Sequence, residues 1–126
     1  SLHDALPILA FVNGAPHIGH AYEKILTDVI YRHFTQRCDK HYFLTGTDEH
    51  GIKIQKTSAS QGITPKELCD MNSQKFKDAW KALCVDYDKF IRTTDEYHEK
   101  VVQKIFKILQ TNSFLCLLDN AYYLCT

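Results

Sequence analysis

The chain lacks an excess of charge of either sign, and it lacks any long hydrophobic run. Its 126 residues carry 15 Lys and Arg against 15 Asp and Glu, so the formal net charge is zero with the histidines neutral. This balance excludes a protein that holds nucleic acid by bulk positive charge, and we expect no DNA partner. No apolar stretch approaches the ~20 residues of a transmembrane helix, and no signal peptide is legible. We therefore expect no membrane partner and a cytoplasmic location.

The cysteines lack the regular spacing of a disulfide framework. Five cysteines are separated by wide, irregular gaps, a pattern that indicates reduced thiols. The sequence is 44% hydrophobic and 24% charged, which is typical of a globular domain and argues against intrinsic disorder. Together these features predict a folded protein of a reducing compartment.

The first half of the chain has the pattern of a strand, a helix and a second strand. An apolar run over residues 8–12 precedes an Asn-Gly-Ala-Pro turn, as expected of a buried parallel strand. From residue 17, apolar residues recur every three or four positions and predict an amphipathic helix to about residue 37. A second apolar run, residues 42–44, ends in Thr-Gly-Thr. The separation of the two runs suits a right-handed parallel crossover, so the predicted fold class is α/β.

The second half is mostly helical by the same criteria. Residues 52–61 predict a short helix that Gly62 ends, and Thr64 with Glu67 forms a capping box for the next helix. The expected buried stripe of that helix is Leu68, Met71, Phe76, Ala79, Trp80 and Leu83. A similar capping pattern at 93–96 predicts a further long helix, lined by Val101, Val102, Ile105, Phe106 and Leu109. Residues 114–125 resemble a hairpin with a two-residue turn.

Polar residues gather where the two predicted strands end, which is where parallel α/β sheets bind ligands. His17 and His20 are three residues apart, so they project from one face of a first helical turn, with Gly19 between them. The free N–H groups and the dipole of a helix N-terminus favour an anion. We predict a polyphosphate site, in which the two imidazoles stabilise charge on the α-phosphate and on the leaving pyrophosphate.

Other interpretations stay open from these residues alone. Each histidine could be only a hydrogen-bonded residue at a helix start. The pair could instead bind zinc with Asp48 or His50 as a third ligand, because spacing does not exclude it. Asp48 could also serve merely as a cap for the short helix that starts near Ile52.

Three segments carry a resemblance to a known family. Pro16 is followed by His-Ile-Gly-His, the signature of class I aminoacyl-tRNA synthetases. Residues 43–51 read Phe-Leu-Thr-Gly-Thr-Asp-Glu-His-Gly and resemble a segment of the methionyl-tRNA synthetases at the family spacing. Residues 90–94, Phe-Ile-Arg-Thr-Thr, resemble a third segment. The leucine, isoleucine, valine and cysteine relatives share the first motif but not the second, so the chain resembles the methionyl-tRNA synthetase family.

This resemblance implies an α/β, Rossmann-type (HUP-like) parallel sheet with flanking helices, incomplete at its C-terminal side. Residues 1–7 match nothing in the family, 8–113 correspond to the first half of the catalytic domain, and 114–126 to the start of a connective insertion with a zinc knuckle. Cys125 falls where the first knuckle cysteine lies, and its partners would lie beyond Thr126. We therefore expect no metal site in these residues, and a structural zinc only in a longer parent protein.

The resemblance also implies roles for individual residues. His17 and His20 would be catalytic through contacts with the ATP phosphates. The whole ATP-binding segment would comprise Asn13, Gly14, Pro16, His17, Ile18, Gly19 and His20. The methionine site would take Leu9 and Phe11 from the first strand, with Asp48 as the partner of the substrate ammonium. The family usually has Tyr at the Phe11 position, but packing against a thioether needs only the ring.

The implied reaction is that of a methionine–tRNA ligase. ATP, as its Mg²⁺ complex, would activate methionine to methionyl-adenylate, and the methionyl group would pass to the 3'-terminal adenosine of tRNA(Met). The family's lysine-rich Lys-Met-Ser-Lys-Ser loop is absent from these residues, so we expect them to be inactive alone. Two alternatives are a cytidylyltransferase-like enzyme, which the Glu-His-Gly at 49–51 disfavours, and an inactive synthetase-like binding module.

Overall fold

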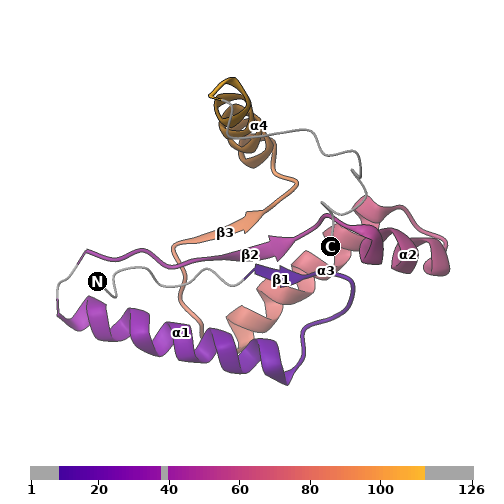
Figure 1. Cartoon of the computed structure of the whole chain (residues 1–126). Coiled ribbons are helices and arrows are strands. Elements are labelled where there is room, and N and C mark those ends of the chain that lie inside the picture. The colour runs from indigo at the N-terminus through magenta and orange to yellow at the C-terminus, as the bar shows by residue number, and fades with distance from the viewer. Residues whose placement is uncertain (1–8, 38–39, 113–126) are drawn as a thin grey trace.

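The computed structural model describes residues 9–37 and 40–112 of the chain. In order, the elements are β1 (Leu9–Phe11), α1 (Ile18–Gln36), β2 (Leu44–Asp48), α2 (Ile52–Gln61), α3 (Pro65–Ala82), β3 (Lys89–Arg92) and α4 (Glu96–Thr111) (Figure 1). The three strands form a parallel sheet in the order β1-β2-β3, which confirms the predicted α/β class. The predicted hairpin and the segment 1–7 lie outside the described residues.

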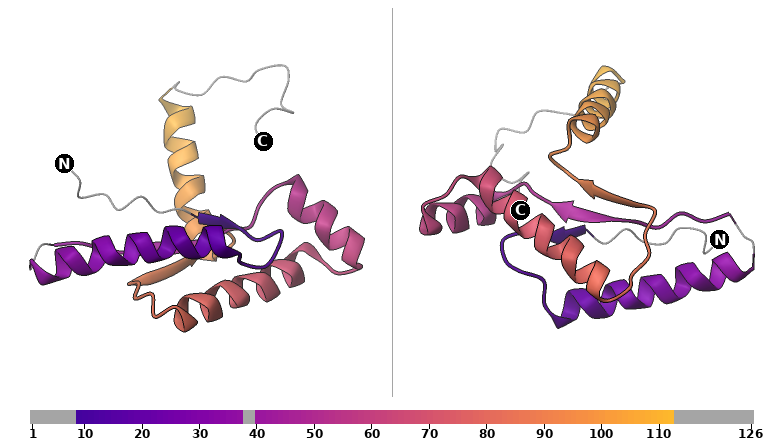
Figure 2. Two further views of the ribbon diagram at one scale, coloured as in Figure 1. Left: turned by 90° about the horizontal axis from the view of Figure 1, so that it is seen from below. Right: turned by 180° about the vertical axis from the view of Figure 1, so that it is seen from behind.

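The helices lie on both sides of this sheet. Figures 1 and 2 show α1 and α3 on one side, α4 projecting from the other, and α2 beyond the carboxyl end of β2. The loop after β1 turns back beneath the sheet, so α1 runs in the opposite direction to the strand that precedes it. This layering places the loop after β1 and the turn after β2 at one edge of the sheet.

Local sequence signals set most helix ends. Thr64 Oγ1 accepts from the Glu67 N–H at 3.2 Å, and the Glu67 carboxylate accepts from the Thr64 N–H at 2.8 Å, so the predicted capping box starts α3. Gly62 ends α2 with a left-handed φ of 68°. The cap of α4 is Asp95, which makes no side-chain cap bond; its carboxylate accepts from the Arg92 N–H instead. The pattern at 93–96 therefore predicted the position of this helix start correctly, but the expected side-chain cap bond is not formed.

The strand β2 starts two residues later than the apolar run at 42–44 and continues through Asp48. The reason is its pairing with β1, in which Leu9 lies opposite Gly46 and Phe11 lies opposite Asp48. On its other side β2 pairs with β3, a strand that the sequence pattern did not predict. A Cβ atom at Gly46 would lie 1.9 Å from the Ile91 carbonyl oxygen, so only glycine fits there.

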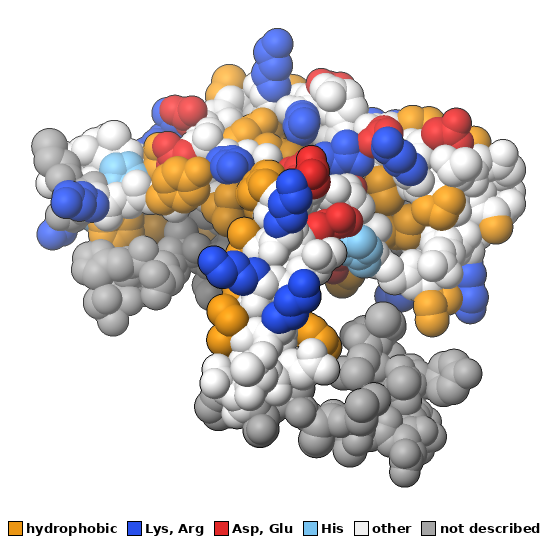
Figure 3. Space-filling model, turned by 90° about the horizontal axis from the view of Figure 1, so that it is seen from above, with side chains coloured by type: hydrophobic (Ala, Val, Ile, Leu, Met, Phe, Trp, Pro, Cys, Tyr) orange, Lys and Arg blue, Asp and Glu red, His pale blue; other side chains and the backbone are white. Residues whose placement is uncertain are grey.

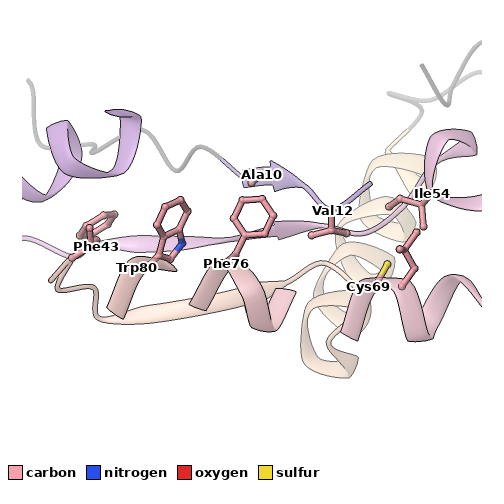
Figure 4. Close-up of a cluster of buried hydrophobic side chains, with 9 residues drawn as sticks. Ala10, Val12, Phe43, Ile54, Cys69, Phe76 and Trp80 are labelled. Carbon is pink, nitrogen blue, oxygen red and sulfur yellow. The ribbon is translucent and has the colours of Figure 1, made fainter. Parts of the chain in front are cut away.

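The hydrophobic core lies between the sheet and α3 (Figure 4). Its buried members are Ala10, Val12, Phe43, Ile54, Leu68, Cys69, Phe76, Trp80 and Val85. The stripe predicted for α3 is wrong at Met71 and Leu83, which are 51% and 40% exposed. Met71 lies about 60° around the helix from Leu68, away from the four-residue row that faces the sheet. Leu83 follows the last residue of α3.

The predicted helix α4 is present, but none of its residues is buried. Its apolar residues Val101, Val102, Ile105, Phe106, Ile108 and Leu109 are 37–56% exposed. They stay exposed because α4 projects from the side of the sheet that faces away from the core; Figure 3 shows hydrophobic and lysine side chains together on this projecting helix. Among the described helices, none is both long enough and apolar enough to cross a membrane.

Candidate functional site

The two polar segments singled out in the sequence leave the sheet at the same edge. Because β1 and β2 are parallel neighbours, the loop 13–17 and the turn 48–51 both begin at strand carboxyl ends. Side chains alternate between the faces of a strand, so Leu9, Phe11 and Asp48 share the face opposite the core. Phe11 is accordingly 59% exposed, whereas Ala10 is 5% exposed. The structure therefore brings together the three residues that we predicted for methionine.

The two signature histidines cap α1 reciprocally. Nδ1 of His17, the N-cap residue, accepts from the Gly19 N–H at 3.1 Å. Nδ1 of His20, in the first turn, accepts from the His17 N–H at 3.2 Å. The two rings stack with centroids 3.8 Å apart. A Cβ atom at Gly19 would lie 2.9 Å from the His17 ring, so a glycine here lets that ring fold back over the helix start.

This capping determines where the imidazole protons lie. A ring nitrogen that accepts a backbone hydrogen bond cannot carry a proton, so in a neutral ring the hydrogen is on the other nitrogen. Both His17 and His20 accept through Nδ1, which assigns both hydrogens to Nε2. The site thus presents two N–H donors beside the N-terminus of a 19-residue helix, where a phosphate oxygen is favoured.

The surroundings of His20 favour its neutral form. Burial and the neighbouring His17 lower the pKa of His20, and Lys24 acts in the same direction while Glu23 opposes it. The His20 ring also packs edge-on against Phe76 of α3, with centroids 5.1 Å apart. Helix α3 therefore supports the turn that carries the two histidines.

The remaining residues of the predicted ATP segment lie in the loop or at the helix start. Asn13 and Gly14 are exposed, Pro16 is half-buried, and Ile18 is 86% exposed. The loop is anchored where it leaves the sheet, because Asn72 of α3 donates to the Val12 carbonyl at 2.7 Å. Exposed residues on an anchored backbone are accessible to a ligand.

Asp48 is not a helix cap. The N-cap of α2 is Gly51, and it makes no side-chain cap bond. The Asp48 carboxylate accepts from the His50 N–H at 3.3 Å, within the turn that follows β2. The alternative that Asp48 serves to start α2 is therefore wrong.

The zinc alternative also lacks a ligand set in the described part of the chain. Over residues 9–37 and 40–112, no three His, Cys, Asp or Glu side chains lie close enough together to hold a metal ion. The histidine pair thus has no third ligand among these residues. Cys125, which we assigned to a zinc knuckle in a longer protein, lies outside them.

Sequence reasoning missed the groups that hold the turn after β2. Glu49 is 5% exposed; its carboxylate lies 2.7 Å from Arg92 Nε of β3, and its N–H donates to Thr93 Oγ1. Asn72, 3% exposed, is the corresponding anchor of the other loop. Asn72 lies four residues after Leu68 and four before Phe76, and a polar residue within an apolar row is the signal that could have revealed it.

Comparisons with known proteins agree with this arrangement. The family model described as tRNA synthetases class I (M) matches residues 7–126. The methionine–tRNA ligase of Helicobacter pylori is 46% identical over 99 residues, covering 79% of this chain and 15% of that protein. The methionine–tRNA ligase of Brucella suis is 41% identical over 124 residues, covering 91% of this chain and 24% of that protein. The chain thus spans a quarter or less of the length of these two relatives.

A solved structure shares the fold. Mycobacterium tuberculosis methionyl-tRNA synthetase in complex with methionyl-adenylate superposes with a TM-score of 0.81 at 39% identity, over 83% of this chain and 21% of that one. This likeness confirms the Rossmann-type parallel sheet predicted from the sequence. The structure places the His-Ile-Gly-His helix start beside the Thr-Gly-Thr-Asp-Glu-His-Gly segment. The chain belongs to the methionyl-tRNA synthetase family of the class I tRNA synthetases.

Proposed function

We propose that the complete protein is a methionine–tRNA ligase. In its first step a carboxylate oxygen of methionine attacks the α-phosphorus of Mg²⁺-bound ATP, and pyrophosphate leaves. In its second step a hydroxyl of the 3'-terminal adenosine of tRNA(Met) attacks the methionyl carbonyl, and AMP leaves. The activity belongs to a whole protein several times longer than the matched segment, and we expect residues 1–126 alone to be inactive.

One observation carries this proposal: the loop that leads to the His17–His20 helix start and the Phe11–Asp48 pair lie at the same edge of the sheet. The Nε2–H groups of His17 and His20 would donate to oxygens on the α-phosphate and the leaving pyrophosphate. These bonds strengthen as charge develops there, which lowers the barrier more than it stabilises bound ATP. Asn13, Gly14, Pro16, Ile18 and Gly19 would complete the nucleotide contact. The homologue solved with methionyl-adenylate supports this assignment by its fold.

On the sheet face beside them, the Phe11 ring and Leu9 would pack against the methionine side chain. Asp48 would accept hydrogen bonds from the substrate ammonium. We place the protein in the cytoplasm, in keeping with the two described cysteines, Cys69 and Cys84, which are both free thiols. No metal ion is assigned to these residues beyond the Mg²⁺ that arrives with ATP.

Methionine-dependent exchange of pyrophosphate into ATP tests this function. The complete protein should catalyse this exchange. Asp48→Asn should weaken the binding of methionine by about 2 kcal/mol, because the substrate ammonium loses a charge-assisted hydrogen-bond partner. Calorimetric titration with methionine should show this loss of affinity. Thermal unfolding should show little change in melting temperature, since Asp48 caps no helix. Absence of exchange and of methionine binding in the wild-type protein would favour an inactive, synthetase-like binding module instead.

A further inference from the structure

Glu49 is held by every polar group it has. Its carboxylate accepts from Thr47 Oγ1 at 2.8 Å and from Arg92 Nε at 2.7 Å, and it also accepts from Thr94 Oγ1. Its N–H donates to Thr93 Oγ1 at 2.9 Å, and its carbonyl accepts from Cys69 Sγ at 3.8 Å. The Glu49 side chain is 0% exposed. This is a fully partnered buried carboxylate, with partners on β2, β3, α3 and the segment before α4.

Arg92 connects this carboxylate to the outside of the molecule. While Nε pairs with Glu49, the terminal nitrogen of the same guanidinium lies 2.6 Å from Asp70 on α3. The hydrogen bond that Arg92 donates to Glu49, with the one that it donates to Asp70, raises the pKa of Arg92, although burial opposes the shift. The Asp70 side chain is 47% exposed and that of Glu49 is 0% exposed, so the ion pair of Arg92 with Glu49 is the inner one and that with Asp70 the outer one.

The position of Glu49 in the chain gives this network its consequence. Glu49 directly follows Asp48, the last residue of β2, and precedes His50, whose N–H donates to the Asp48 carboxylate. Strand alternation and the register with β1 place Asp48 on the face beside Phe11, and the bonds of Glu49 on the core side fix the turn that continues from it. The ring of His50 is drawn in as well, with Nε2 3.4 Å from the Thr93 carbonyl.

We propose that Glu49, through its ion pair with Arg92, is a positioning residue that sets the orientation of Asp48 and thereby the affinity for the amino-acid substrate. The inference rests on the proposed function for the identity of that substrate. Because its side chain is 0% exposed, Glu49 would act through Asp48 and not by contact with the substrate. Because the buried Glu49 side chain is held by several hydrogen bonds, the turn after β2 cannot sample orientations in which the Asp48 carboxylate points away from the site. Misplacement of a binding group by about 1 Å can cost as much as a hundredfold.

The test is Glu49→Gln in the complete protein, with Asp70→Asn as the matched control. The amide keeps the shape of Glu49 but removes the charge that holds Arg92 inward. We expect the KM for methionine to rise at least about tenfold, while the KM for ATP stays within twofold. Asp70→Asn removes the outer, exposed charge on the same guanidinium and should leave both constants near wild type.

Hydrogen exchange supplies a readout that does not depend on activity. Amides of residues 48–51 should exchange faster in Glu49→Gln, and those of the α3 core should not. If Glu49→Gln fails to fold, Glu49→Asp probes the same pair, because aspartate keeps the charge but is one methylene shorter and cannot keep the contacts with Arg92, Thr47 and Thr94 together; the KM for methionine should rise here too. Unchanged methionine KM and unchanged exchange in the folded variant would overturn the proposal. If the wild-type protein binds no methionine, the proposed function is wrong, and the exchange rates alone decide whether Glu49 positions the turn.

Discussion

His17→Asn should separate two roles that the His17 side chain combines. Nδ1 caps α1 through the Gly19 N–H at 3.1 Å, whereas Nε2–H is the donor that we assign to the ATP phosphates. The carboxamide oxygen of asparagine can occupy the place of Nδ1, and asparagine is among the strongest N-cap residues. It has no group in the place of Nε2. His17→Ala lacks both groups, and both variants lose the ring stack on His20.

The two variants should therefore differ in stability but not in rate. We expect His17→Ala to lower the free energy of unfolding by about 1 kcal/mol relative to His17→Asn, which is the typical value of a lost N-cap. Both should slow pyrophosphate exchange by about a hundredfold, the usual effect of removing one transition-state donor. Urea unfolding gives the first quantity, and exchange at saturating ATP and methionine gives the second. If His17→Asn exchanged pyrophosphate at the wild-type rate, the donor role of Nε2 would be refuted. If the two variants were equally stable, the capping role of Nδ1 would be refuted.

Two further predictions concern stability. Gly46→Ala should lower the free energy of unfolding by about 3 kcal/mol or more, because its Cβ would lie 1.9 Å from the Ile91 carbonyl oxygen. Nothing lies within 4 Å of a Cβ at Gly14, so the control Gly14→Ala should lower it by less than about 0.5 kcal/mol. Denaturant titration measures both values. Since the pKa of His20 is lowered from its ordinary 6.5, the unfolded chain binds the proton more readily, and the free energy of unfolding should decline as the pH falls below that value. In His20→Gln, which keeps a capping-box acceptor, the decline should be shallower; an identical slope would contradict the assignment.

The helices were the most predictable part of the fold, because their signals are local. A capping box needs only Thr64 and Glu67, and a left-handed end needs only Gly62. The strand β3 was missed for the opposite reason: four residues with one exposed and three half-buried side chains carry no clear alternation. It becomes a strand only because β2 offers it a partner.

Local sequence was enough to predict the parallel crossover and which polar residues follow its strands. His17 and His20 face the same way because they are three positions apart at a helix start, and both signature segments follow strands. Tertiary structure decided what holds these groups in place. Glu49 and Arg92 are 43 residues apart, and Asn72 and Val12 are 60 apart, so no local pattern reports their contact. Tertiary structure also decided that no side chain fits at Gly46 and that none of the residues of α4 is buried. Such outcomes depend on which surfaces meet, and that is settled only when the whole chain packs.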